Sequence, residues 1–314
     1  MPEDEKVLTF SNGAAGTARP EAGWRRCLVE LHRAVVREVL SCSAGGTGIV
    51  NAKGDAVKSF DLAANDAAIR RLEKTGPPLI VESEESARRK LGLGKPEARV
   101  VLDPVDGSDN RSRGLPLSAF SCAVLPVDAP LHPKHVEAAI VGPIEQKESW
   151  LALKGQGAWL GNKEITTSDV TKIAQALISV ELNHYGPSHA LARLMASAGG
   201  VRSYGCCSRA LAFVASGAAD AHVDIRRRLT AESYLAGAML VLEAGGCVVG
   251  LDGAPLPAAD GLTDRVGLIA AANQQLCERI LDCLIDDDAN QPGVCPDNGR
   301  SSGGRNGDPS SGQF

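Results

Sequence analysis

The chain has 314 residues and a net charge of −5, and 44% of its residues are hydrophobic while 4% are aromatic. This length is enough to bury one large core or two modest ones. The acidic balance excludes a general attraction for nucleic acid or for an anionic membrane surface, so we expect neither as a partner. The 9 cysteines are odd in number and lack the spacing of zinc ligands, which favours reduced thiols in a cytoplasmic protein. No stretch is long and apolar enough for a membrane span, and the acidic residues 1–5 do not resemble a signal peptide.

The first part of the chain combines helices with short strands. Residues 1–20 show no periodic pattern, which predicts a loose arm. Apolar residues recur at helical spacing over 24–40 and 61–74, which predicts two helices separated by a polar loop at 51–55. Short apolar runs bounded by turn residues predict the strands of a largely antiparallel sheet, over residues 79–81, 100–102, 119–125, 138–144 and 149–153.

From residue 167 onward, helices and strands alternate more regularly. The predicted strands cover residues 177–180, 201–204, 221–225, 248–249 and 266–271. The predicted helices cover residues 188–198, 208–216, 231–244 and 274–284. Such alternation is typical of layered α/β proteins.

These patterns divide the chain into three parts. We expect a flexible arm over 1–20, one domain over 21–286, and a disordered tail rich in Gly and Ser over 287–314. Within the domain, an N-terminal α+β half covers about 21–166 and a C-terminal α/β half covers about 167–286.

The stretch around which the chain is organised is the apolar run that ends in Asp103 and Asp106. Pro104 is expected to stop the strand and to hold both carboxylates on one turn, where they repel each other unless a cation lies between them. Hard divalent ions such as Mg²⁺ prefer oxygen ligands of this kind. Gly107 and Ser108 then offer backbone N–H groups that would favour a phosphate at the start of a helix. The alternative is an ordinary turn, because Asp, Pro and Gly are common turn residues.

A second predicted strand also ends in acids. The strand over 79–81 leads into Glu82, Glu84 and Glu85, and we interpret Glu85 as a solvated loop residue. Asp61, at the start of the preceding helix, is interpreted as a helix cap or an early acid. Neighbouring strands would bring the two acidic ends into one cluster, and a metal beside a phosphate site predicts phosphoryl chemistry.

Several motifs in the same order resemble one known family. They are Ser83-Glu84-Glu85, Asp103-Pro-Val-Asp-Gly-Ser-Asp-Asn110, Lys154-Gly-Gln-Gly-Ala158, Val214-Ala-Ser-Gly217 with Asp220, and Glu243-Ala-Gly-Gly246. Over residues 24–284 this set resembles the inositol monophosphatase superfamily of Mg²⁺-dependent, Li⁺-sensitive phosphatases. The resemblance implies an α/β protein built as an αβαβα five-layer sandwich of the inositol monophosphatase/fructose-1,6-bisphosphatase type, and a homodimer.

The resemblance also implies roles for individual residues. The implied metal ligands, for two or more Mg²⁺ ions, are Glu84, Asp103, the Val105 carbonyl, Asp106 and the residue at position 233. Gly107 and Ser108 would hold the phosphate, while Glu84 and the Ser108 hydroxyl would orient a metal-bound water. Asp103 is our expected bridging ligand, which makes Glu84, Asp103 and Ser108 the expected catalytic residues.

The chain departs from the family pattern where it should complete the second metal site. Ser233 stands where the family has Asp, and a hydroxyl is a weaker ligand for a hard ion than a carboxylate. Glu232 could replace it only if the helix start were rotated, because one helical step is about 100°, and Asp224 is the other candidate. We therefore expect one of two outcomes: either the second metal site is weak, or the protein is a catalytically impaired family member that acts as a binding protein. Three further positions also differ from the family: Lys58, Asn65 and Arg111.

The substrate is indicated only by the basic run Arg226-Arg227-Arg228, which is expected to follow the strand over 221–225. Arg226 is our candidate ligand for a second phosphate or carboxylate, and a solvated basic loop is the alternative. The pattern from Asp224 to Arg226 resembles the archaeal and bacterial branch, some members of which hydrolyse fructose 1,6-bisphosphate. An inositol monophosphate, a sugar phosphate, fructose 1,6-bisphosphate and 3'-phosphoadenosine-5'-phosphate all remain open as the small phosphorylated substrate.

Overall fold

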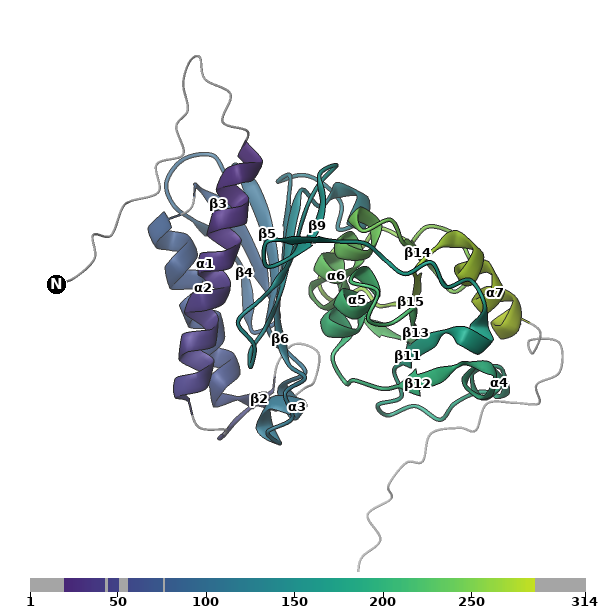
Figure 1. The fold of residues 1–314 in the computed structure, drawn as a ribbon. Coiled ribbons are helices and arrows are strands. Elements are labelled where there is room, and N and C mark those ends of the chain that lie inside the picture. Colours follow the sequence, from purple (N-terminus) through teal and green to yellow (C-terminus); the bar gives the residue numbers. More distant parts are fainter. Residues whose placement is uncertain (1–19, 43–44, 51–55, 76, 286–314) are drawn as a thin grey trace, which may run out of the picture.

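The computed structural model describes residues 20–42, 45–50, 56–75 and 77–285. The predicted tail, the predicted polar loop at 51–55 and all of the predicted arm except residue 20 lie outside the described residues. Five layers alternate across the molecule (Figure 1): two helices, an eight-stranded sheet, two helices, a five-stranded sheet and two helices. This layer order confirms the predicted αβαβα sandwich.

The outer layer at one end consists of α1 (Pro20–Ser41) and α2 (Ser59–Thr75). Leu28, Leu31, Val35 and Val39 of α1 are buried at the spacing that predicted this helix. A hairpin of β1 (Gly46–Val50) and β2 (Ala56–Lys58), which the sequence did not predict, connects the two helices.

The eight-stranded sheet has the order β10-β9-β8-β7-β6-β5-β3-β4. Its strands are β3 (Leu79–Ser83), β4 (Ser86–Leu91), β5 (Ala98–Asp106), β6 (Ala119–Leu125), β7 (Ala138–Pro143), β8 (Trp150–Leu153), β9 (Gly157–Leu160) and β10 (Lys163–Ile165). All neighbouring pairs are antiparallel except β3 and β5, which are parallel with Ser83 opposite Leu102. The carboxyl ends of β3 and β5 therefore meet at one edge, as predicted.

Pro104 does not stop β5, contrary to the prediction, because the strand continues to Asp106. Beyond Leu102 the strand has no partner on the β3 side, and its register against β6 shifts between Asp103 and Asp106. A proline is tolerated at such an edge or bulge, since its missing N–H leaves no ladder hydrogen bond unmade. The short helix α3 (Ser108–Ser112) follows directly.

The five-stranded sheet has the order β12-β11-β13-β15-β14. Its strands are β11 (Leu177–Val180), β12 (Gly200–Arg202), β13 (Ala221–Leu229), β14 (Cys247–Val249) and β15 (Val266–Ala271), and its helices are α4 (His189–Ser197), α5 (Cys207–Ala215), α6 (Ala231–Glu243) and α7 (Gln274–Ile285). Some neighbouring strands of this sheet are parallel and others are antiparallel. Two single-turn helices, η1 (Pro133–His135) and η2 (Ile173–Gln175), complete the fold.

The basic run lies within β13 and not in a loop after it, which corrects the prediction that this strand ends at residue 225. The register of β13 against β15 shifts between Asp224 and Leu229, and Arg227 has a φ of 54°. Because Arg227 and Arg228 are exposed, their charges interrupt the apolar pattern without ending the strand.

The central helices α5 and α6 pack closely because Gly237 lets them approach. A Cβ at this position would lie 2.6 Å from the Cβ of Leu211. Gly237→Ala should therefore lower the free energy of unfolding by about 1–3 kcal/mol, the usual cost of overpacking, although alanine is the better helix former. Urea denaturation measures this change. Gly186→Ala is the control, since no atom lies within 4 Å of its Cβ, and a Gly237→Ala protein more stable than the wild type would contradict the packing described.

Candidate active site

The acids at the ends of β3 and β5 lie side by side. The backbone N–H of Glu84 donates to the carbonyl of Leu102 at 3.3 Å, which places Glu84 beside the residue before Asp103. Asp103 is buried, and its Oδ1 accepts a hydrogen bond from the N–H of Val105 at 3.0 Å. The predicted ligands Glu84, Asp103 and Val105 are thus gathered at one edge of the sheet.

Asp106 connects this edge to the C-terminal half of the chain. Its Oδ2 accepts a hydrogen bond from the N–H of Ser208 at 2.7 Å, at the start of α5. Burial raises the pKa of Asp106, and the nearby charge of Glu84 raises it further. The mutual repulsion indicates that Asp106 and Glu84 belong to one cluster.

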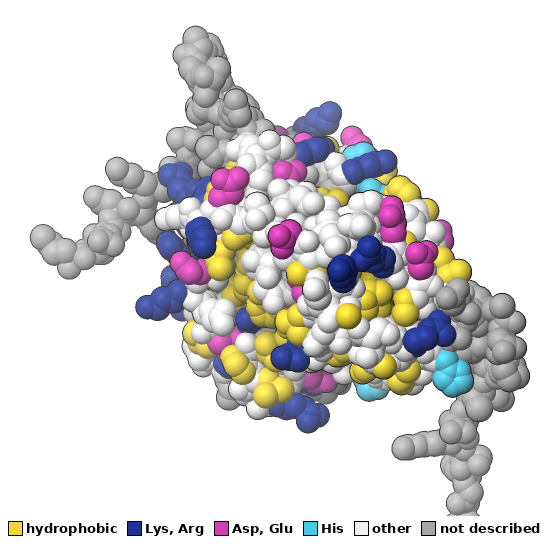
Figure 2. All heavy atoms as spheres, turned by 45° about the vertical axis from the view of Figure 1, so that its right-hand side comes forward, with side chains coloured by type: hydrophobic (Ala, Val, Ile, Leu, Met, Phe, Trp, Pro, Cys, Tyr) yellow, Lys and Arg dark blue, Asp and Glu magenta, His cyan; other side chains and the backbone are white. Residues whose placement is uncertain are grey.

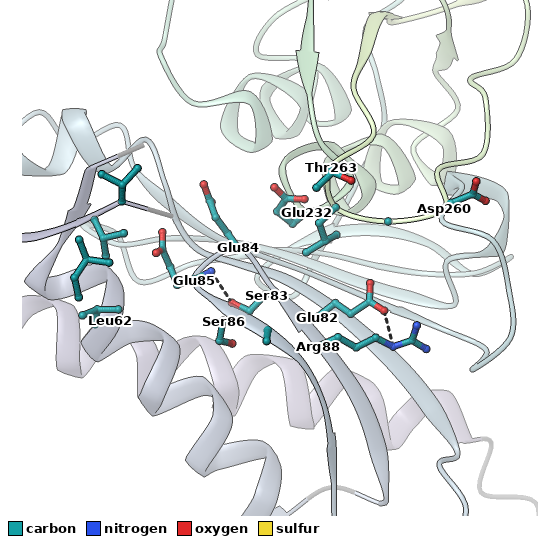
Figure 3. Close-up of a pocket in the computed structure, with 16 residues that line it drawn as sticks. Leu62, Glu82, Ser83, Glu84, Glu85, Ser86, Arg88, Glu232, Asp260 and Thr263 are labelled. Carbon is teal, nitrogen blue, oxygen red and sulfur yellow. Dashed lines mark hydrogen bonds and ion pairs between the residues drawn. The ribbon is translucent and has the colours of Figure 1, made fainter. Parts of the chain in front are cut away.

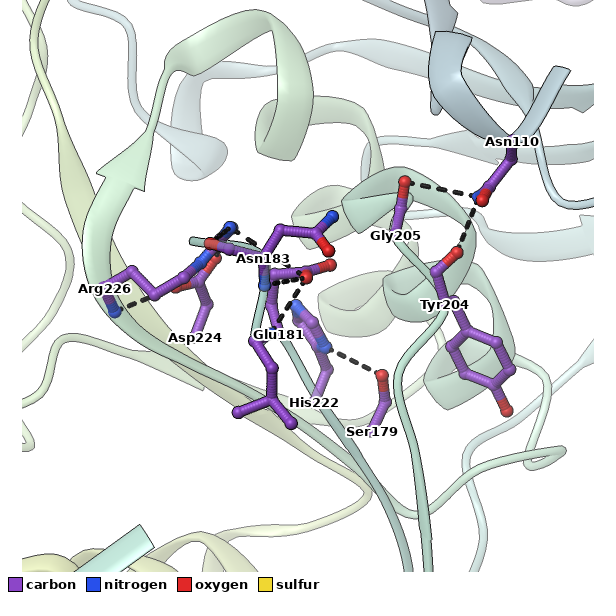
Figure 4. Close-up of polar contacts among 10 residues, drawn as sticks. Asn110, Ser179, Glu181, Asn183, Tyr204, Gly205, His222, Asp224 and Arg226 are labelled. Carbon is purple, nitrogen blue, oxygen red and sulfur yellow. Dashed lines mark hydrogen bonds and ion pairs between the residues drawn. The ribbon is translucent and has the colours of Figure 1, made fainter. Parts of the chain in front are cut away.

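Asn110 makes a second connection between the two halves (Figure 4). Its Nδ2 donates to the carbonyl of Tyr204 at 2.7 Å and to that of Gly205 at 3.4 Å. The same nitrogen donates to the carbonyl of Leu117 at 3.1 Å. The segment 106–110 is therefore held against the start of α5 from both ends.

Gly107 occupies a conformation that glycine adopts best. Its φ is 79°, and a Cβ there would lie 3.0 Å from the carbonyl oxygen of Leu117. This turn directs the backbone into α3, whose first residue is Ser108. The predicted role of Gly107 and Ser108 in holding phosphate stays a prediction.

Asp61 is a site residue that the sequence reasoning missed. It lies in the first turn of α2, is 3% exposed, and its Oδ2 accepts a hydrogen bond from the N–H of Lys58 at 2.9 Å. Its Oδ1 is buried, with no hydrogen-bond partner among the described residues. Burial raises the pKa of Asp61 to about 7, with further contributions from Glu85 and Glu84. An aspartate at the start of a helix is also an ordinary helix cap, so only the fold distinguishes a capping role from a place in the acidic cluster.

Glu85 is not the solvated loop residue that the sequence predicted. It is half-buried and lies close enough to Asp61 to raise the pKa of that carboxyl. The turn that carries it is fixed by Asn65, whose Oδ1 accepts hydrogen bonds from Ser83 Oγ at 2.7 Å and from Ser86 Oγ at 3.4 Å. The acidic cluster therefore includes Glu85 and Asp61 as well as the predicted residues.

A cavity of about 520 Å³ opens beside this cluster (Figure 3). Among the described residues that line it, five are acidic and one is basic: Glu82, Glu84, Glu85, Glu232, Asp260 and Arg88. The one basic residue, Arg88, is already paired with Glu82 at 3.1 Å. The cavity is thus strongly negative, although the aliphatic side chains of Ile49, Val50 and Leu62 form part of its wall.

A second cavity, of about 280 Å³, has Asp106 among its lining residues. Ser233 lines it together with Asp106, so the position predicted to complete the second metal site does lie at the cluster. The arginines that line this second cavity are Arg226, Arg228 and Arg265. Asp106 and Glu181 also line this cavity, so acidic and basic side chains face each other in it.

Arg226 and Asp224 bind each other and so limit each other's predicted roles (Figure 4). The guanidinium donates to both carboxylate oxygens, at 3.0 and 2.6 Å, and to the carbonyl of Asn183 at 3.2 Å. Asp224 is completely buried in this pair. Asp224 therefore serves as the partner of Arg226, and Arg226 would bind a substrate anion only by sharing its donors.

The donors fit a hard divalent cation. All are oxygen atoms, several are buried, and the Oδ1 of Asp61 has no hydrogen-bond donor among the described residues. Among the residues that the structure describes, no three His, Cys, Asp or Glu side chains are arranged as a ready-made metal site.

The chain is similar to known proteins over most of its length. The model of the inositol monophosphatase family matches residues 23–285. A fructose-1,6-bisphosphatase/inositol-1-monophosphatase of Methanothermobacter thermautotrophicus is 30% identical over 270 residues, which cover 82% of this chain and 94% of the relative. An inositol-1-monophosphatase of Mesorhizobium japonicum is 29% identical over 206 residues, or 64% of this chain and 74% of the relative.

The fold is similar to that of solved structures as well. A protein of Pyrococcus horikoshii, described as similar to inositol-1 monophosphatase, superposes with a TM-score of 0.70 at 26% identity, over 84% of this chain and 98% of that one. The inositol monophosphatase of Anabaena superposes with a TM-score of 0.68 at 21% identity, over 84% of this chain and 96% of that one. The chain therefore belongs to the inositol monophosphatase family and is a phosphoric monoester hydrolase.

Proposed function

We propose that the protein is a Mg²⁺-dependent phosphomonoesterase that hydrolyses an inositol monophosphate or a sugar phosphate. The observation that carries the proposal is the convergence of carboxylates from three separate segments: Asp61 and Asp103 are buried, and Glu84 and Asp106 are half-buried. Such a cluster is unfavourable unless a cation compensates it. The relatives named as phosphatases support the same chemistry.

Glu84, Asp103, Asp106 and the Val105 carbonyl would hold the ions. Bound Mg²⁺ would lower the pKa of a coordinated water and offset the charge of the phosphate. Residues of the chain would bind and orient the substrate. The N–H groups of Gly107 and Ser108 would orient the phosphate, and Asn110 and Ser208 would keep this segment fixed against α5.

Glu84 and the Ser108 hydroxyl would orient the attacking water. Asp61 is a further candidate for accepting a hydrogen bond from this water, at Oδ1, since that oxygen has no hydrogen-bond partner among the described residues.

Fructose 1,6-bisphosphate is the second candidate substrate. Arg228 and Arg265 line the cavity that contains Asp106 and Ser233, and guanidinium groups suit a second phosphate. For 3'-phosphoadenosine-5'-phosphate the support is weaker, because in the part of the chain that is described no Phe, Tyr or Trp lines either cavity as a platform for a base.

Release of inorganic phosphate from inositol 1-phosphate and from fructose 1,6-bisphosphate, with Mg²⁺ or with EDTA, tests the proposal. We expect Mg²⁺-dependent release at least about 100-fold above the EDTA background. If neither ester nor p-nitrophenyl phosphate is hydrolysed at saturating Mg²⁺, the protein is instead the catalytically impaired binding protein that Ser233 suggests.

We further propose a cytoplasmic homodimer that acts on small metabolites and binds no nucleic acid. Every cysteine that the structure describes is a free thiol, which suits a reducing compartment. On the face shown in Figure 2, basic side chains lie scattered among acidic and apolar ones, whereas a nucleic-acid site would gather them. Within the described ranges, none of the helices has the length and apolar character needed to cross a bilayer.

A further inference from the structure

We propose that Glu232, and not Ser233, supplies the carboxylate of α6 to the metal site. The inference rests on the proposed metal-dependent function. It concerns the position at which this chain departs from its family, where a carboxylate is replaced by a hydroxyl.

Ser233 and Glu232 face different cavities. Ser233 lines the smaller cavity together with Asp106, where it offers only a neutral hydroxyl. Glu232 lines the larger cavity together with Glu84 and Glu85. Figure 3 shows Glu232 and Glu84 extending into this cavity from the two halves of the chain. The helix start therefore already directs a carboxylate towards the acidic cluster, without any rotation.

The backbone of Glu232 is fixed next to the predicted bridging ligand. Its carbonyl accepts a hydrogen bond from Ser121 Oγ at 3.1 Å. Ser121 lies directly opposite Asp103 in the ladder between β5 and β6. This contact places the first turn of α6 against the strand that carries the site.

The side chain of Glu232 is also held in place. It is 2% exposed, and its Oε1 accepts a hydrogen bond from Thr230 Oγ1 at 2.5 Å. A carboxylate on a rigid helix turn, oriented by a neighbouring hydroxyl, is arranged as metal ligands usually are. Its burial beside other carboxylates is costly unless a cation binds there.

Asp61 provides an independent indication that a cation belongs in this cluster. Its buried Oδ1 lacks a hydrogen-bond donor among the described residues, and the residue lies near Glu84 and Glu85. A divalent ion between Glu84 and Glu232 would compensate charges contributed by both halves of the chain.

Titration of the full chain with Mn²⁺, followed by the electron paramagnetic resonance of the free ion, tests the proposal. Mn²⁺ shares the oxygen preference of Mg²⁺. Glu232→Gln should weaken one binding site by at least about 10-fold. Asp260→Asn removes a charge from the same cavity, but its side chain is exposed, so we expect a change of less than about twofold.

Ser233→Asp alone provides a second test that does not depend on the folding of the Gln variant. If Glu232 already serves the site, the added carboxylate should change the Mn²⁺ affinity by less than about threefold. An increase of about 10-fold or more would show that the site lacked its carboxylate, and would overturn the inference.

Thermal unfolding separates a ligand from a merely structural residue. Without metal, the Glu232→Gln protein should be at least as stable as the wild type, because the substitution removes a buried charge. On adding Mn²⁺, its Tm should rise by less than that of the wild type. Equal Mn²⁺ affinity and equal gain in Tm for the two proteins would contradict the inference alone. A wild type that binds no Mn²⁺ at all would contradict the metal-dependent function itself.

Discussion

Asp103→Asn should reduce kcat/KM for phosphate release by about 10³-fold or more, a loss of about 4 kcal/mol of transition-state stabilisation. Asparagine preserves the size of the side chain and its Oδ1 acceptor for the N–H of Val105. It removes the negative charge at the residue expected to bridge the metal ions, and a neutral amide is a much poorer ligand for them. Steady-state hydrolysis of inositol 1-phosphate with Mg²⁺ measures the effect.

Asp128→Asn is the matched control, because Asp128 is an exposed aspartate on the loop after β6. We expect this variant to retain activity within about twofold. The Tm of the Asp103→Asn protein without metal should not fall below that of the wild type, since the replacement relieves repulsion in the cluster. Retention of more than about a tenth of the activity would exclude Asp103 from the metal site.

Asp61→Asn should increase the stability of the metal-free protein at pH 8 by up to about 4 kcal/mol. Burial raises the pKa of Asp61 from 3.8 to about 7, so the folded state binds a proton that the unfolded state has already released. The wild type must therefore lose stability as the pH rises from about 4 to about 7, and the variant lacks this loss. Urea denaturation of both proteins in EDTA across this range measures the difference.

His32 and His222 change the free energy of unfolding with pH in the opposite direction, so their contribution must be separated from that of Asp61. Burial lowers the pKa of both imidazoles, so stability falls as the pH drops below about 6.5. The difference between wild type and Asp61→Asn at each pH cancels this contribution. Saturating Mg²⁺ should remove most of the difference, because the cation stabilises the Asp61 carboxylate. A difference that is independent of pH would contradict the placement of Asp61 in the cluster.

Much of the architecture could be predicted because its signals are periodic. The apolar spacing predicted α1, and the two strands that end in acids predicted that these acids would meet if the strands were neighbours. The structure shows that β3 and β5 are neighbours and that the pair is parallel. The wrong predictions concern residues whose local preference is overridden. Pro104 continues β5 because no β3 residue is left to pair with it, and β13 continues through the basic run because those side chains reach solvent or Asp224.

The remaining features of the site depend on packing that no local pattern encodes. Asp61 is indistinguishable from a helix cap until α2 is placed beside the turn that carries Glu84 and Glu85. Likewise, the sequence alone leaves Glu232 and Ser233 as alternatives, because they are one helical step apart. The docking of α6 on Ser121 decides which of the two faces the acidic cavity.

A crystal grown with Mn²⁺ and phosphate, and measured at the manganese absorption edge, tests the metal-dependent account most directly. The account predicts anomalous peaks bounded by Glu84, Asp103 and Asp106, with a phosphate against the N–H groups of Gly107 and Ser108. Manganese bound only elsewhere, with these carboxylates still apart and the phosphate absent, would contradict it.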